Sequence, residues 1–194
     1  FVSPYIRTVQ TFELIKKGRT IDPVSVLAFN YTGVTHYLSG RFSEAVTNFS
    51  ESVRMHPLSI RQYDHLAKAY LVQNQFAEVV ETINSALQLT TTRPPSTLAY
   101  LSVGYHHLGG LSKAKKLLQD LIERSLRQEK GINIYLAQYY SILNEKEEAF
   151  HWLEKAMETN DVDLFWLKAD PLFKNLHADS RYQQYLSKAG FIKG

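Results

Sequence analysis

The sequence of 194 residues contains no cysteine, which excludes disulfide bonds, thiolate metal sites and cysteine nucleophiles. It also lacks any apolar run near the roughly 20 residues that a membrane-spanning helix needs, and its N-terminus has no signal-peptide pattern. Neither sign of charge is in large excess, because 22 Lys and Arg residues are balanced by 19 Asp and Glu residues. The resulting net charge of +3 is a weak argument for a nucleic-acid partner. The remaining composition, 44% hydrophobic and 21% charged, is typical of a folded soluble protein, and we expect a cytoplasmic location.

What the sequence does contain is a repeat with a period of 34 to 35 residues. A small residue recurs at Ala45, Val79, Ala114 and Ala149. A few residues earlier, each repeat has a residue that tolerates a left-handed backbone: Gly40, Asn74, Gly109 and Asn144. Apolar residues on both sides of this turn follow a helical period, so each repeat is predicted to be a pair of amphipathic helices. Such a hairpin cannot bury its apolar face alone, so the pattern predicts an all-α fold of stacked hairpins.

This pattern resembles the tetratricopeptide repeat (TPR) family. The matching repeat positions are Gly33, Gly40, Ala45, Phe49 and Pro57 in the first repeat, Leu66, Tyr70 and Ala86 in the second, Tyr105 and Ala114 in the third, and Tyr140, Ala149 and Ala156 in the fourth. The resemblance implies a right-handed superhelix, an α-solenoid, with repeats at 26–59, 60–93, 95–128 and 130–163. The third and fourth repeats lack the family's closing proline, and the third has Ser102 where the family has Gly or Ala.

Helix signals extend the repeats at both ends. Ser3, Pro4 and Gly18 predict an N-terminal helix within residues 1–20, and the second helices of the first and third repeats are predicted to begin at the N-caps Ser43 and Ser112. We interpret the loop at 90–96 as a connection between repeats inside a single domain, 1–194. The chain begins with Phe1 in place of Met, which suggests a fragment of a larger protein.

The 34-residue register ends after Asp163, and residues 164–194 are predicted to cap the last repeat. Two short helices are predicted, the first with Asp170 as N-cap and Pro171 at its first position, the second between Asp179 and Gly190. Their apolar residues would cover the exposed end of the solenoid: Trp166, Leu172, Phe173, Leu176, Tyr182 and Leu186.

The stretch from Ala149 to Tyr182 is similar to the closing segment of a bacterial TPR group. The matches are Ala149, Trp152, Leu153 and Ala156, followed by Trp166, Leu167, Asp170, Pro171, Phe173, Leu176, Asp179, Arg181 and Tyr182. In that group such arrays commonly form the C-terminal arm of class III nucleotide cyclases, winged-helix regulators or serine/threonine kinases. The resemblance implies a regulatory arm of a larger signalling protein.

The sequence contains no convincing motif for catalysis, metal binding or cofactor binding, and we expect no catalytic residue, metal or cofactor in this chain. His106 and His107 are adjacent on a helix, so they diverge and cannot share a metal as an i, i+4 pair could. Ser112 and Lys115 match the Ser-x-x-Lys motif of β-lactamases, but the companion motifs of those enzymes are absent. The basic residues of the third repeat's second helix are interpreted as a solvated face, without the aromatic platform of single-strand binders: Lys113, Lys115, Lys116, Arg124 and Arg127.

The TPR resemblance implies that the first helix of each repeat faces a concave groove. The predicted partner-binding residues of this groove are Tyr31, Val34, Tyr37, His65, Lys68, Tyr100, Val103, His107, Tyr135 and Gln138, and Ser141 is expected to line the groove with them. Aromatic rings with a polar tip suit an extended peptide or a partner helix, and the alternative is that they only pack between neighbouring helices. The carboxylate clamp of some TPR proteins is not expected, because its basic anchors are missing.

Together these features predict a non-catalytic module that binds a protein or a peptide, most simply as the regulatory arm of a bacterial signalling protein. Two alternatives remain open at this point. One is a free-standing adaptor, and the other is a sensor of a small ligand or signalling peptide.

Overall fold

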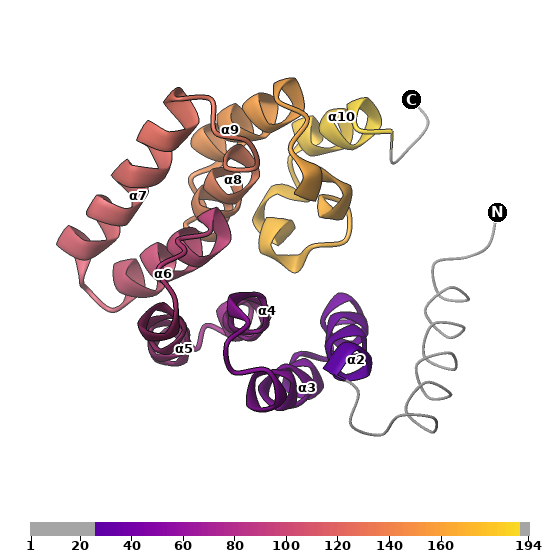
Figure 1. The fold of residues 1–194 in the computed structure, drawn as a ribbon. Coiled ribbons are helices and arrows are strands. Elements are labelled where there is room, and N and C mark those ends of the chain that lie inside the picture. The colour runs from indigo at the N-terminus through magenta and orange to yellow at the C-terminus, as the bar shows by residue number, and fades with distance from the viewer. Residues whose placement is uncertain (1–25, 191–194) are drawn as a thin grey trace. The chain divides into compact units, whose positions relative to one another are not determined.

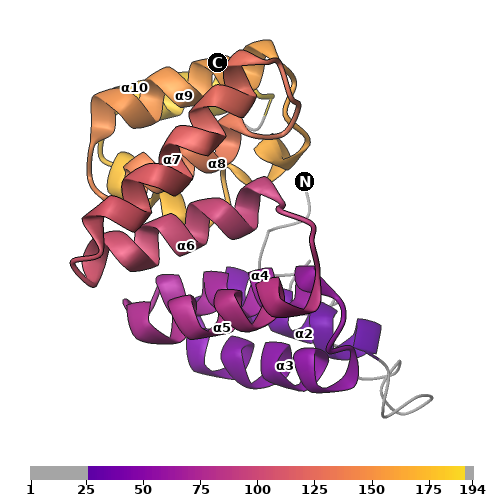
Figure 2. The same cartoon turned by 60° about the vertical axis from the view of Figure 1, so that its left-hand side comes forward.

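The structure is a computed structural model that describes residues 26–190. The predicted N-terminal helix, with Ser3, Pro4 and Gly18, lies outside these residues. Every regular element within residues 26–190 is a helix, as the sequence predicts, and the hairpins can be followed in Figures 1 and 2. The chain divides into two compact units between Thr91 and Thr92, inside the loop at 90–96.

Within residues 26–190, each unit contains two helical hairpins. In the first unit, α2 (Val26–Leu38) pairs with α3 (Phe42–Met55), and α4 (Ile60–Leu71) pairs with α5 (Phe76–Leu89). In the second unit, α6 (Pro95–His107) pairs with α7 (Leu111–Leu126), and α8 (Asn133–Ile142) pairs with α9 (Lys146–Glu158). Two 3-10 helices, η1 (Val162–Trp166) and η2 (Pro171–Leu176), and a final helix α10 (Ser180–Lys188) follow.

The four hairpin turns have one backbone design. Gly40, Asn74, Gly109 and Asn144 all have positive φ, between 58° and 79°. The residue after each of them returns a backbone hydrogen bond to the preceding helix, as Arg41 N does to His36 O over 2.9 Å. That residue is also the N-cap of the next helix, which therefore begins at once.

This turn corrects the predicted N-caps. Helix α3 begins at Phe42 with Arg41 as N-cap, and α7 begins at Leu111 with Gly110 as N-cap. Ser43 and Ser112 therefore lie inside the first turn of their helices. Neither cap position provides a side-chain hydrogen bond, because the left-handed residue and the single linking residue already complete the turn.

The core of the first unit forms where α2, α3 and α4 meet. Phe49 is buried, and its ring lies directly under Gly33 of α2, where no Cβ occupies the space. Tyr37, Ala45, Leu66 and Ala69 complete this buried cluster. The small residues at recurring positions thus allow the neighbouring helices to approach closely.

In the second unit the small positions are equally buried. Ala114, Ala149 and Ala156 are at most 1% exposed. Ser102, which replaces the family's Gly or Ala, is buried and donates its hydroxyl hydrogen to the carbonyl oxygen of Ala114 over 2.9 Å. This bond satisfies the polar group that the substitution brings into the core. The other repeat positions differ in burial: Ala86 is buried, Tyr70, Tyr105 and Tyr140 are half-buried, and Gly40 and Pro57 are exposed.

The C-terminal segment packs on α8 and α9. Asp170 and Asp179 are the N-caps of η2 and α10, as predicted, accepting hydrogen bonds from the backbone N–H groups of Leu172 and Arg181. Ser141 on α8 donates to the carbonyl of Leu172 over 2.8 Å. Phe173, Leu176 and Tyr182, together with Leu167, Leu172 and Leu186, are buried. Trp166, predicted to belong to this set, is only half-buried. Helix η1 was not predicted.

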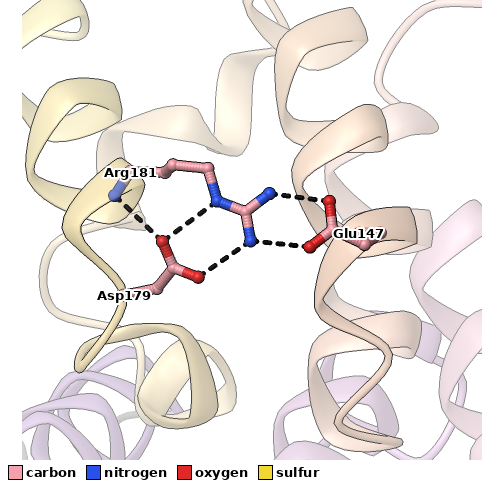
Figure 3. Close-up of polar contacts among 3 residues, drawn as sticks. All are labelled: Glu147, Asp179 and Arg181. Carbon is pink, nitrogen blue, oxygen red and sulfur yellow. Dashed lines mark hydrogen bonds and ion pairs between the residues drawn. The ribbon is translucent and has the colours of Figure 1, made fainter.

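One arginine ties α10 to α9 (Figure 3). The guanidinium of Arg181 donates to both carboxylate oxygens of Glu147, over 2.7 and 2.8 Å, and to both oxygens of Asp179, over 3.0 and 2.8 Å. It also lies 4.2 Å from the ring centroid of Phe150. Hydrogen bonds from Arg181 hold the pKa of the Asp179 carboxyl at about 2. The Asp-x-Arg sequence therefore acts as both a helix cap and an inter-helix clamp.

Candidate partner-binding surface

In the first unit, the predicted groove residues lie on α2 and α4 with different exposures. Tyr31 is 58% exposed, whereas Tyr37 is buried in the core. Val34, His65 and Lys68 are half-buried. The Lys68 ammonium lies 5.3 Å from the centroid of the Tyr37 ring, which is a cation–π distance. Tyr31 is thus the aromatic ring on this surface that is most available to a partner.

His65 joins the two helices beneath this surface. Its Nδ1 lies 2.6 Å from the Oδ1 of Asn30 on α2, and its ring lies 5.3 Å from that of Phe49. Burial, followed by the nearby charges of Lys68 and Arg61, lowers the pKa of His65 to about 4. The imidazole is therefore neutral at neutral pH, so Nδ1–H can donate to the Asn30 amide oxygen.

In the second unit, three predicted groove residues are buried. Tyr100, Val103 and Gln138 are at most 3% exposed. The Tyr100 hydroxyl donates to the Gln138 amide oxygen over 3.3 Å, and Gln138 Nε2 donates to the Asp170 carboxylate over 2.9 Å. This buried chain of hydrogen bonds connects α6, α8 and the N-cap of η2. Tyr100 and Gln138 therefore pack between neighbouring helices.

Tyr135 is half-buried, and its surroundings contain residues that the repeat pattern did not single out. Its hydroxyl donates to the carboxylate of Asp163 in η1. In the same short helix Val162 is 79% exposed and Phe165 is 53% exposed, and the Phe165 ring lies against that of Trp166 with centroids 4.3 Å apart. Val162 and Phe165 thus form an exposed apolar feature on η1, a helix that the repeat pattern does not predict.

The remaining predicted residues lie near the turns of the second unit. Ser141 is buried against η2, and Asn175 Nδ2 donates to its carbonyl over 2.9 Å. His107 is exposed at the end of α6, and partial burial, followed by the charge of His106, lowers its pKa. Tyr139 on α8 approaches His106, with its hydroxyl 3.4 Å from Nδ1.

Neither a metal-binding cluster nor a membrane-spanning helix is found among the described residues. Within residues 26–190, no group of His, Asp and Glu side chains is arranged to hold a metal ion. In the same part of the chain, no helix combines the length and apolarity needed to cross a membrane.

Comparisons with known proteins agree with the repeat. Residues 134–160, which span most of the fourth hairpin, match the sequence model of a tetratricopeptide repeat. No curated protein sequence matches the chain.

Several solved structures share the fold at low sequence identity. MamA is 19% identical, with a TM-score of 0.52 over 78% of this chain and 87% of that one. PilW, a type IV pilus biogenesis factor, is 18% identical, with a TM-score of 0.56 over 96% and 87%. YrrB, described as a TPR protein with an unusual peptide-binding site, is 13% identical, with a TM-score of 0.53 over 90% of both chains. The sequence match is thus confined to the fourth hairpin, and the solved structures share the all-helical fold.

Proposed function

We propose that this chain is a non-catalytic module that binds a protein or peptide, with Tyr31 as a contact in the first unit and, independently, Tyr135, Val162 and Phe165 as contacts in the second. The observation that carries this proposal is the exposure of Tyr31, Val162 and Phe165, which are 58%, 79% and 53% exposed. Exposed aromatic and aliphatic side chains on rigid elements lose little conformational entropy on binding, and they are the usual anchors of an interface.

The polar groups beside these anchors suit an extended peptide. Asn30 and His65 lie on neighbouring helices of the first unit, and the Tyr135–Asp163 pair lies next to Val162 in sequence and space. Groups of this kind can hydrogen-bond the backbone of a bound segment while its side chains contact the exposed rings. The peptide-binding site named for YrrB is a property of that protein, and it favours the same kind of role here.

We further propose that the module is the regulatory or interaction arm of a larger bacterial signalling protein. The support is the closing pattern from Ala149 to Tyr182, whose Asp170, Asp179 and Arg181 have the capping and clamping roles described above. This part is tested separately, by the mass of the native polypeptide captured from its source with an antibody to this chain. A species well above 22.3 kDa is expected, and a species of that mass would leave a free-standing adaptor.

The binding proposal is tested by affinity capture with paired variants. Tyr31→Ala with Phe165→Ala removes one anchor from each unit, and both residues are exposed enough for the fold to survive. Leu58→Ala with Leu126→Ala is the matched control, because these leucines are 76% and 68% exposed outside the proposed surface. We expect the first pair to lose the captured partner and the control to retain it. Equal retention by both would refute the assigned surface. Tyr100 is a poor probe, since it is buried.

A further inference from the structure

The turn between α6 and α7 presents an apolar tip. Leu108 is 53% exposed and Leu111 is 49% exposed, on either side of Gly109 and Gly110. Backbone hydrogen bonds fix this turn, from Gly109 N to His106 O over 3.2 Å and from Gly110 N to Tyr105 O over 2.8 Å. The two leucines are therefore held outward by an ordered backbone.

Three lysines follow this tip at the start of α7. Lys113, Lys115 and Lys116 are all exposed, within the first two turns of α7. The first turn of α7 has no acidic residue, whereas the corresponding turns of α3, α5 and α9 contain glutamates. Positive charge near the N-terminus of a helix is unfavourable to the helix dipole. Lys113 lies in that first turn, so the helix dipole does not favour its position.

The described part of the chain does not neutralise these charges. None of the three lysines forms an ion pair within residues 26–190, although Lys113 lies 5.0 Å from the centroid of the Tyr105 ring. The nearest acids on the same helix have other contacts: Asp120 lies 3.8 Å from Arg124, and Glu123 accepts a hydrogen bond from Gln119. The lysines thus remain available to an external anion.

We propose that Leu108, Leu111, Lys113, Lys115 and Lys116 form a docking surface for an acidic protein segment that carries an apolar side chain. This surface, the α6–α7 tip, shares no residue with the contacts proposed above at Tyr135, Val162 and Phe165. The lysines would attract the acidic side chains of the segment, and the two leucines would contact its apolar side chain.

The surroundings of the tip favour a narrow segment over a membrane. The contact between His106 and Tyr139 places the end of α8 beside the end of α6, so the acidic start of α9 is close by. Glu145 and Glu148 are exposed there. A flat anionic bilayer would approach these glutamates together with the lysines, whereas a single acidic chain can contact the lysines alone.

The test is fluorescence anisotropy with the full chain and a fluorescein-labelled synthetic peptide built of glutamate and leucine. Lys115→Gln with Lys116→Gln removes two charges from the outer side of α7, and Lys174→Gln with Lys188→Gln is a control with the same change in net charge. Phosphatidylserine vesicles and a peptide with glutamine in place of glutamate are tested in parallel. We expect saturable binding that weakens with salt, and a loss of affinity of about tenfold in the Lys115 and Lys116 variant only.

Leu108→Ser and Leu111→Ser should weaken binding without changing its salt dependence. Three results would overturn the proposal. These are no saturable binding of the acidic peptide, an equal loss of affinity in the Lys174 and Lys188 control, or binding of the vesicles in preference to the peptide.

Discussion

Replacing Gly33 by alanine tests the packing of the first unit, because two effects of opposite sign compete at this position. Gly33 lies inside α2 with ordinary helical backbone. Alanine inside a helix is normally more stable than glycine by about 1 kcal/mol. The backbone alone therefore predicts that Gly33→Ala stabilises the protein.

The packing predicts the opposite. A Cβ at position 33 would lie 2.5 and 2.6 Å from Cε1 and Cδ1 of the Phe49 ring, whereas carbon atoms normally approach to about 3.5 Å. Phe49 is 2% exposed and is enclosed by the same cluster as Tyr37 and Leu66, so its ring has no free space to enter. Overpacking of this kind costs about 1 to 3 kcal/mol. We expect Gly33→Ala to lower the free energy of unfolding by up to about 2 kcal/mol overall.

The assay is urea unfolding followed by far-ultraviolet circular dichroism, because both tryptophans, at 152 and 166, lie in the second unit. The matched background is Phe49→Leu, which removes the clashing ring atoms. In that background Gly33→Ala should be neutral or stabilising, and the double-mutant cycle should give a coupling energy of more than about 1 kcal/mol. A stabilising Gly33→Ala in the wild-type chain would refute the packing argument.

Three further predictions concern charged and polar groups. The pKa of His65 is lowered from 6.5 to about 4, so between these pH values the folded state binds fewer protons than the unfolded state. The free energy of unfolding should therefore fall by up to about 3 kcal/mol as the pH drops from 6.5 to 4. His65→Phe should remove that part of the pH dependence in urea titrations at each pH, and an unchanged profile would contradict it. Buried Asp161 accepts hydrogen bonds from the backbone N–H groups of Gly131 and Ile134. Asp161→Ala should therefore lower the free energy of unfolding by about 2 to 3 kcal/mol, and Asp161→Asn should lower it less. Both are measured by tryptophan fluorescence in urea. Equal effects of Asp161→Ala and Asp161→Asn would count against the role of these hydrogen bonds at the start of α8. Arg181→Ala should lower the unfolding midpoint by the same assay more than Glu147→Gln, because it also removes the contacts with Asp179 and Phe150. A larger effect of Glu147→Gln would be inconsistent with this clamp.

The local features of the fold were predictable because they depend on short-range rules. Gly40, Asn74, Gly109 and Asn144 were recognisable as left-handed turn residues, since few residue types accept positive φ. Asp170 and Asp179 were recognisable as N-caps, because an aspartate before a helix offers its carboxylate to the first free N–H groups. Ser43 and Ser112 were misassigned, because serine is also tolerated one position inside a helix and the turn geometry decides where that helix begins.

The candidate surface was less predictable, since burial depends on segments that are distant in sequence. Tyr100 and Gln138 occupy the same repeat positions as partly exposed residues elsewhere, but they are buried and linked to Asp170 of the C-terminal segment. Nothing in the 34-residue period indicates that η2 packs on α8. The exposure of Val162 and Phe165 likewise depends on η1, which follows the last repeat and has no counterpart in the pattern.

The most direct test of partner binding is site-specific photocrosslinking in the source cells. Tyr31 and Phe165 are replaced one at a time by p-benzoylphenylalanine, and Leu58 and Leu126, which are more exposed than either, serve as controls. The proposed function predicts that one partner polypeptide is crosslinked from position 31 or 165 and is absent from both control positions. A partner crosslinked only from positions 58 and 126 would contradict it.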